Sequence, residues 1–239
     1  MSSVTIAQIS DTHMRYAPSD AADDFSPDAT LRRTVDAVAS YAPDLVLLTG
    51  DISDDGSLEG CERARDIIAR LGVPILATPG NHDVATIVAQ VFGDATATTI
   101  LGWHVVAIDT AVPAKEAGRL DVPSALAAID ALDGPTLVAL HHPPISLSTH
   151  PWFQLDGGGA LVSALAERPN VRAVVSGHLH QAFDVHLGHV SYIGCPSSWY
   201  GIAHHGSTWV EDRGGLVGAH VFHLAHNGTL TFTAVRRPN

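Results

Sequence analysis

The sequence predicts an α/β fold in which buried strands and helices form layers, and two observations lead to this prediction. Short apolar runs rich in β-branched residues end in polar residues, and helical spacing of apolar residues follows most of them. Such alternation is typical of buried sheets with helices on their faces. The chain has 239 residues, 46% of them hydrophobic, so we expect one sizeable core and a single domain over residues 1–239.

Six apolar runs are predicted to be strands because they are short and rich in Val, Ile, Leu and Ala. They cover residues 4–9, 45–48, 73–77, 104–108, 137–140 and 171–175. Helices are predicted where apolar residues recur at steps of three and four. These segments are residues 31–39, 64–71, 126–132 and 161–165, and Gly72 follows the second as a stop signal.

The end of the chain departs from this alternation. Residues 185–193 and 221–235 alternate apolar and polar side chains, as hairpin strands do, and Asn227-Gly228 is a favourable turn pair. We therefore expect C-terminal antiparallel hairpin strands.

Charge and hydropathy exclude some classes of partner. The net charge is −12, so the chain does not attract long nucleic acid, and an anionic substrate needs a local site such as a metal centre. No apolar run approaches the length that crosses a bilayer, and the first residues carry no secretory signal. We expect a cytoplasmic protein without a membrane partner.

Five of the predicted strands are followed by side chains that can bind metals. These motifs are Asp11-Thr12-His13, Gly50-Asp51, Gly80-Asn81-His82-Asp83, His141-His142-Pro143-Pro144 and Gly177-His178-Leu179-His180. Each alone is weak, since Gly-Asp is often a simple turn and two histidines two apart face opposite ways on an extended chain. In open α/β sheets, however, ligands collect outside the carboxyl ends of the strands. All five together therefore predict one shared cleft.

The five motifs resemble the five blocks of the calcineurin-like metallophosphoesterases, over most of the chain. Within that superfamily, Gly80-Asn81-His82-Asp83 and His141-His142-Pro143-Pro144 look like the class III cyclic nucleotide phosphodiesterases and their glycerophosphodiesterase relatives. Protein phosphatases of the superfamily usually have Asp-Arg-Gly after the Gly-Asp block and Glu after Asn-His. Here these places hold Asp54-Asp55-Gly56 and Asp83, which disfavours a protein phosphatase.

The resemblance implies a four-layer α-β-β-α sandwich of two mixed sheets flanked by helices, and it implies a role for most motif residues. One metal would be held by Asp11, His13, Asp51 and His180. The other would be held by Asp51, Asn81, His141 and His178. His82 would be catalytic without binding metal, and the substrate phosphate would lie near His13, Asn81, His82 and His180. His142 stays unassigned.

These residue types suit phosphoester hydrolysis. The two oxygens of Asp51 can bridge two metals about 3.5–4 Å apart, which together activate a hydroxide for attack on phosphorus. With two divalent ions, two aspartates and that hydroxide, the centre keeps a charge of about +1, which attracts a phosphodiester monoanion. Imidazole and carboxylate ligands suit Mn, Fe or Zn, as two divalent ions or an iron–divalent pair. His82 can give the leaving oxygen its proton.

We therefore predict a dinuclear phosphodiesterase acting on a small phosphodiester, with a cyclic nucleotide (cAMP, cGMP or a 2′,3′-cyclic form) as the first choice. The alternatives are a phosphomonoesterase or nuclease of the same superfamily, and a non-catalytic metal-binding scaffold, which predicts missing ligands. The oligomeric state stays open, with a homodimer as one alternative.

Three local questions also stay open. Asp83 either orients His82 or a ligand, or has a structural role in a turn. Residues 146–159, with Trp152 and Phe153, form either a lid or base-stacking wall or an ordinary surface loop. Residues 195–205 either line the substrate pocket or lie apart from it.

Overall fold

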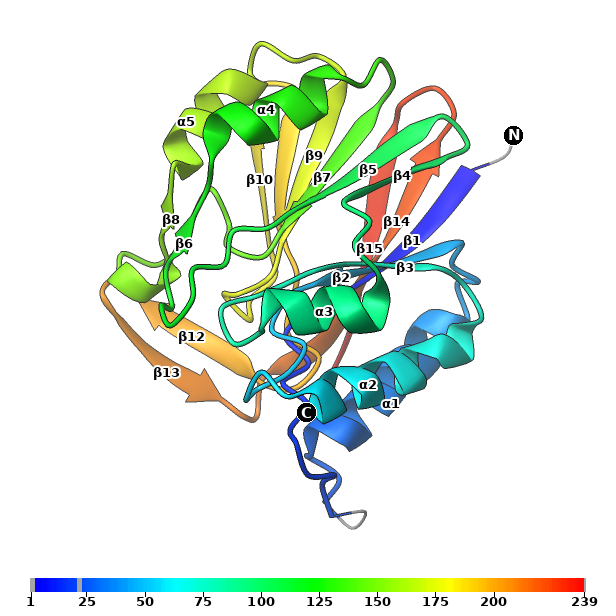
Figure 1. Ribbon diagram of the computed structural model, residues 1–239, viewed down its shortest axis with the longest axis vertical. Coiled ribbons are helices and arrows are strands. Elements are labelled where there is room, and N and C mark those ends of the chain that lie inside the picture. Colours follow the sequence, from blue (N-terminus) through cyan, green and yellow to red (C-terminus); the bar gives the residue numbers. More distant parts are fainter. Residues whose placement is uncertain (1–2, 21–22, 239) are drawn as a thin grey trace.

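The computed structural model describes residues 3–20 and 23–238, and it has two sheets packed face to face between two layers of helices (Figure 1). Sheet I has the strand order β15-β14-β1-β2-β3, and sheet II has the order β10-β11-β9-β7-β5-β4. The four-layer sandwich implied by the resemblance is confirmed.

Sheet I combines three parallel strands with a C-terminal hairpin. Its parallel strands are β1 (Ser3–Ile9), β2 (Leu45–Thr49) and β3 (Ile75–Thr78), and its hairpin strands are β14 (Leu216–Ala225) and β15 (Leu230–Pro238). β14 pairs antiparallel with β1 and β15. The register places Ile9 beside Leu48 and Thr49 beside Thr78, so the motifs that follow these strands leave the sheet at one end.

Sheet II has four parallel strands between two antiparallel edges. The parallel strands are β5 (Trp103–Ile108), β7 (Thr136–Leu140), β9 (Val171–Ser176) and β11 (Val190–Gly194), and the edge strands are β4 (Ala97–Ile100) and β10 (Phe183–Leu187). The predicted hairpin over residues 185–193 is confirmed as β10 and β11.

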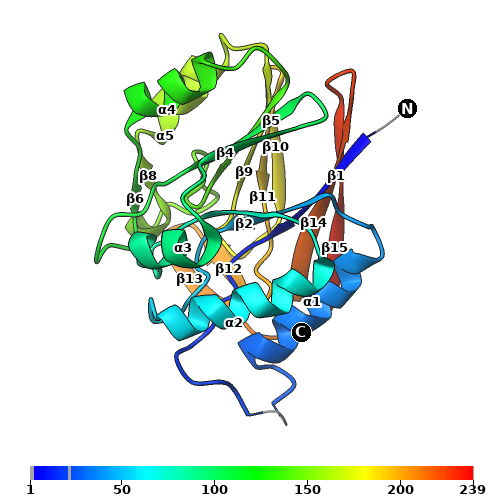
Figure 2. The same ribbon diagram turned by 45° about the vertical axis from the view of Figure 1, so that its right-hand side comes forward.

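Helices cover the outer face of each sheet, as Figures 1 and 2 show from two directions. Helices α1 (Pro27–Ala39), α2 (Leu58–Ile68) and α3 (Ala85–Phe92) pack on sheet I, and α4 (Val122–Asp130) and α5 (Gly158–Leu165) pack on sheet II. A third cluster of buried side chains, including Trp103 and Phe222, fills the space between the sheets. No helix in the described ranges has both the length and the apolar character needed to span a membrane.

Local sequence explains where the predicted helices begin. The Ser26 hydroxyl accepts a hydrogen bond from the N–H of Ala29 at the start of α1, and Ser57 and Asp121 cap α2 and α4 in the same way. After α2, a short 3-10 helix η1 (Ala69–Leu71) ends at Gly72, whose φ of 69° confirms its predicted role as a stop.

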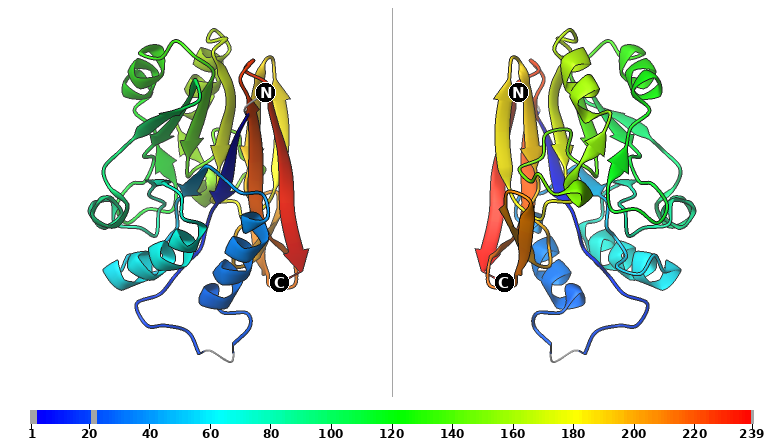
Figure 3. Two further views of the ribbon diagram at one scale, coloured as in Figure 1. Left: turned by 90° about the vertical axis from the view of Figure 1, so that its right-hand side faces the viewer. Right: turned by 90° about the vertical axis from the view of Figure 1, so that its left-hand side faces the viewer.

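The sequence analysis missed several short elements, including the edge strand β4, and two cases are instructive. One is α3, whose sequence ATIVAQVF is rich in β-branched residues, which favour strands, and whose N-terminus has no side-chain cap. The other is a separate hairpin of β12 (Gly201–His205) and β13 (Thr208–Asp212). Figure 3 shows this hairpin at the end of the molecule where β15 ends, which is also the end where β1 delivers its motif.

Candidate metal centre

The five motifs meet at this end of the two sheets. Hydrogen bonds join the segments that follow different strands. The backbone N–H of His178 donates to both carboxylate oxygens of Asp11, at 3.0 and 3.2 Å, and that of Gly177 donates to the carbonyl of His141 at 3.0 Å. The structure therefore brings together side chains about 170 positions apart, as the strand-end argument predicts.

The first predicted ligand set forms one buried group. The ligand atoms of Asp11, His13, Asp51 and His180 lie within 4.8 Å of one another. The Nε2 atoms of His13 and His180 are 3.1 Å apart, and Asp11 Oδ1 lies 3.6 Å from His180 Nε2. Two imidazole nitrogens on one tetrahedral ion, each about 2.0–2.1 Å from it, lie about 3.3–3.4 Å apart. The group thus has the donors and the size for one cation.

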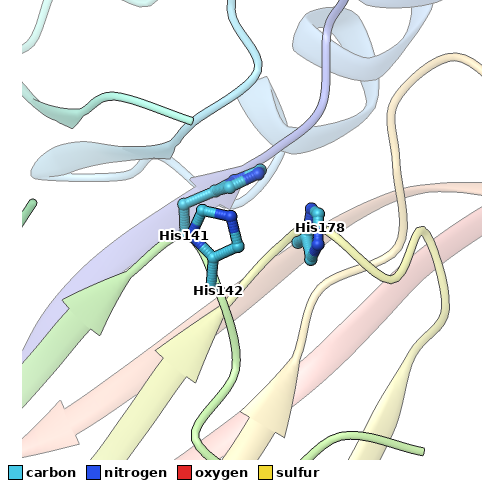
Figure 4. A group of neighbouring side chains, drawn as sticks. All are labelled: His141, His142 and His178. Atoms are coloured by element: carbon cyan, nitrogen blue, oxygen red, sulfur yellow. The ribbon is translucent and has the colours of Figure 1, made fainter. Parts of the chain in front are cut away.

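The second predicted set lies directly beside the first and shares Asp51 with it. His141 Nε2 lies 3.4 Å from Asp51 Oδ1 and 3.1 Å from Asn81 Oδ1, whereas Asp51 Oδ2 lies 3.8 Å from His13 Nε2. Figure 4 shows His141 and His142, which follow β7, opposite His178, which follows β9. Each oxygen of Asp51 therefore faces one set, an arrangement that suits a bridging carboxylate.

Backbone carbonyls fix the tautomers of three predicted histidine ligands. His141 Nδ1 donates to the Thr49 carbonyl at 2.9 Å, and His180 Nδ1 donates to the Tyr200 carbonyl at 2.9 Å. His178 Nε2 donates to the Trp152 carbonyl at 3.0 Å. Because a carbonyl only accepts, each ring carries a proton on that nitrogen, so the opposite nitrogen is the one that can bind a metal. Such outer contacts orient metal-binding histidines.

His142 lies beside His141 and His178, but hydrogen bonds engage both of its ring nitrogens. Its Nε2 donates to the Glu116 carbonyl at 2.9 Å, and its Nδ1 accepts from the Thr110 hydroxyl at 2.8 Å. Burial and the neighbouring His141 lower the pKa of His142 to about 3, so the ring is neutral at pH 7. We infer a supporting role in packing for His142.

The backbone at the candidate ligands is strained. Of the eight non-glycine residues with positive φ in the described chain, five are predicted ligands: Asp11, His13, Asp51, His178 and His180. Residues other than glycine rarely adopt this conformation, and it persists where the surroundings impose it, often at functional sites. His178 and His180 are therefore not on an extended strand, which explains how both can face the same centre.

The charges of the buried carboxylates depend on the histidines around them. Burial raises the pKa of Asp11 to about 6, against the influence of His141. For Asp51 burial acts in the same direction, but the charge and hydrogen bond of His141 outweigh it and hold the pKa of Asp51 well below its usual range. Burial keeps the pKa values of His178 and His180 well below their ordinary value. Both rings are therefore neutral, which is the form that binds metal.

His82 lies at the rim of the centre, where its side chain is 40% exposed. Its Nδ1 donates to the Asp54 carbonyl at 2.8 Å, and its backbone N–H donates to Asp51 Oδ1 at 3.0 Å. The sequence analysis gave Asp54 no role, yet its carboxylate also binds His13 Nδ1 at 3.1 Å. The only signal in the sequence was its place three residues after Asp51.

Asp83 has the structural role that the sequence left open. Its carboxylate accepts backbone hydrogen bonds from Ile52 at 3.1 Å, Ser53 at 2.8 Å and Gly80 at 2.8 Å. These bonds tie the loop after β2 to the loop after β3. We therefore assign Asp83 to the turn that presents Asn81 and His82.

A cavity of about 100 Å³ opens beside the candidate ligands. Its lining combines motif residues, including Asp51, Asn81 and His82, with the aromatic side chains of Trp152, Phe153, Tyr200 and Trp209. Both segments whose position was left open, residues 146–159 and 195–205, thus contribute to the lining. Trp209 was missed because nothing near it in the sequence points to the site.

The chain is similar in sequence to known phosphoesterases. The family model for calcineurin-like phosphoesterases matches residues 4–182. A probable cyclic nucleotide phosphodiesterase from Synechococcus is 33% identical over 209 residues, covering 82% of this chain and 80% of the relative. The 3′,5′-cyclic adenosine monophosphate phosphodiesterase CpdA from Pseudomonas aeruginosa is 31% identical over 224 residues, and the match covers 88% of this chain and 82% of the relative.

Solved structures share the fold. A dimetal phosphatase from Danio rerio superimposes with a TM-score of 0.72 at 10% identity, covering 98% of both chains. GAP50, described as the anchor in the inner membrane complex of Plasmodium, superimposes with a TM-score of 0.63 at 12% identity, covering 98% of this chain and 85% of the other. Because one fold hosts such different proteins, function has to be argued from the site.

Proposed function

Since the chain belongs to the calcineurin-like phosphoesterase family, we propose that it hydrolyses a small phosphodiester, with a 3′,5′-cyclic nucleotide as the first choice. One observation carries this proposal: one oxygen of Asp51 faces His13 of the first predicted ligand set, and the other faces His141 of the second. The names of the two relatives support the substrate class. The scaffold alternative predicts missing ligands, and all seven ligand positions are filled.

The residues of the centre would divide the chemistry among them. Two bound cations would polarise the phosphoryl group and acidify a water molecule between them. Asp51 would hold both cations, and the neutral amide of Asn81 would add no negative charge where the phosphate approaches. His82 would donate a proton from Nε2 to the leaving oxygen while its Nδ1 stays bound to the Asp54 carbonyl. The Asp54 carboxylate, 3.7 Å from Nδ1, would balance the imidazolium charge.

We also propose that Mn, Fe or Zn occupies the centre, because imidazole nitrogens with a few carboxylate and amide oxygens suit these metals. Residues 1–239 would act as one metallophosphoesterase domain, since both sheets supply candidate ligands.

The test is a comparison of substrates with metal-stripped and Mn²⁺-restored protein. We expect metal-dependent hydrolysis of 3′,5′-cAMP and bis(p-nitrophenyl) phosphate, with little hydrolysis of p-nitrophenyl phosphate; 2′,3′-cAMP completes the panel to identify the cyclic form. A preference for the monoester would establish the phosphatase alternative. Absence of turnover from folded, metal-loaded protein would overturn the catalytic proposal.

Replacing His82 by alanine should separate proton donation from metal binding. We expect kcat for 3′,5′-cAMP to fall by about 10²–10⁴-fold, because the sugar alkoxide needs a proton to leave. The effect on bis(p-nitrophenyl) phosphate should be much smaller, since p-nitrophenolate is a stable leaving group. Metal content should not change, and the exposed His226→Ala is the matched control. Equal losses on both substrates would argue against the role of proton donor.

A further inference from the structure

The lining of the cavity includes an aromatic wall formed by two indole rings, Trp152 and Trp209, from separate parts of the chain. Trp152 lies in the 3-10 helix η2 (Pro151–Phe153), which precedes the short strand β8 (Leu155–Asp156), paired with β6 (Gly118–Arg119). Trp209 lies in β13. Their ring centroids are 5.9 Å apart and their planes are inclined by 44°. Trp152 nevertheless remains 43% exposed, so the pair is not simply part of the core.

Contacts behind the two indoles fix them relative to the candidate metal centre. The ring of Phe153 meets the ring of Trp209 edge to face at 5.9 Å, and it lies 5.3 Å from the ring of His178. The Trp152 carbonyl accepts the hydrogen bond from His178 Nε2. The segment that presents the indoles therefore also orients a predicted ligand, and the wall and the centre form one unit.

We propose that Trp152 and Trp209 form a stacking platform for the nucleobase of the substrate, an inference that rests on the proposed phosphodiesterase function. A phosphate at the centre would place the rest of the molecule at the mouth of the cavity whose lining includes both indoles. Stacking on aromatic rings accepts any base, because every base has a π-face. Both purine and pyrimidine cyclic nucleotides should therefore bind.

The alternative ligand for these two tryptophans is a second copy of this chain, which would bind through the exposed ring of Trp152. The arrangement favours the base, because both indoles line a cavity that also contains Asp51, Asn81 and His82.

The experiment compares two substrates that differ only in the base. These are 3′,5′-cAMP and the base-free 1-deoxyribose 3′,5′-cyclic phosphate, assayed with Mn²⁺-loaded wild type, Trp152→Leu and Trp209→Leu. The Trp152 variant keeps the carbonyl that binds His178. Tyr16→Leu, which removes an aromatic ring that is 63% exposed and outside the cavity lining, is the matched control.

We expect wild type and Tyr16→Leu to prefer cAMP over the base-free substrate in kcat/KM by at least about tenfold, which corresponds to about 1.4 kcal/mol. Either tryptophan variant should lose most of this preference, which is a ratio of two rates of the same protein and is therefore independent of any general loss of activity. Equal wild-type rates on both substrates, or a preference that survives both variants, would overturn the platform. The platform would also be overturned if wild type were a dimer and either tryptophan variant were a monomer that kept the preference for cAMP over the base-free substrate.

A second measurement separates this inference from the proposed function. If wild type hydrolyses neither cyclic phosphate, the proposed function fails, and the platform is then judged by calorimetric titration of metal-free protein with 5′-AMP and ribose 5-phosphate. Tighter binding of 5′-AMP that both tryptophan variants abolish would support the platform. Equal binding of the two ligands would overturn it.

Discussion

Replacing Asp51 by asparagine is expected to reduce kcat for the preferred phosphodiester by at least about 1000-fold. Each carboxylate oxygen of Asp51 faces one candidate ligand group, whereas an amide has only one oxygen and no charge. The substitution should leave at most one firmly bound cation per chain. Losing one cation removes several kcal/mol of transition-state stabilisation, and about 4 kcal/mol corresponds to about a 1000-fold loss of rate.

The measurement combines steady-state kinetics with metal analysis by mass spectrometry. Asp66→Asn is the matched control, because Asp66 is exposed and its ion pair with the neighbouring Arg65 is the only one it makes within residues 3–20 and 23–238. Circular dichroism establishes that both variants are folded. An Asp51→Asn protein that retains two metals and wild-type activity would contradict the bridging role.

Replacing Gly80 by alanine is expected to disrupt the same centre through the backbone. A methyl group at this position would overlap the carboxylate and the backbone nitrogen of Asp51, and it would lie 2.9 Å from the carboxylate carbon. Because the clash involves backbone, the loop after β2 or the loop after β3 must shift. We expect a loss of about 1–3 kcal/mol or more in the free energy of unfolding, together with weakened metal binding.

Chemical denaturation of metal-free protein measures the loss of stability, and metal titration measures the loss of affinity. Gly159→Ala is the matched control, since its methyl group would meet nothing within 4 Å and would lie within α5. That variant should be as stable as wild type or slightly more stable. Equal stability and metal affinity of all three proteins would refute the packing argument at Gly80.

The sequence predicted that the motif residues lie together, because parallel strands end at the same side of a sheet. Asp11 and Asp51 follow neighbouring strands of sheet I, and His141 and His178 follow neighbouring strands of sheet II. The sets that join residues of both sheets were implied by the resemblance. The close approach of two loops at Gly80 was not predicted.

What could not be predicted depends on tertiary contacts that leave no local pattern. Asp54 binds His13 through its side chain and His82 through its backbone carbonyl. Every residue has a backbone carbonyl, so the residue type at position 54 does not reveal the second contact. Trp209 reaches the cavity only because the β12–β13 hairpin folds beside η2. The β-branched composition of α3 favours a strand, and packing against α2 and β3 overrides it.

The origin of the candidate ligands in two different sheets has a mechanical consequence. Asp11, His13 and Asp51 follow strands of sheet I, whereas His141, His178 and His180 follow strands of sheet II. A cation bound to residues of both groups would cross-link the two sheets reversibly, and its free energy of binding would add to the stability of the folded protein. Supply of the metal would then set the lifetime of the folded protein as well as its rate of turnover.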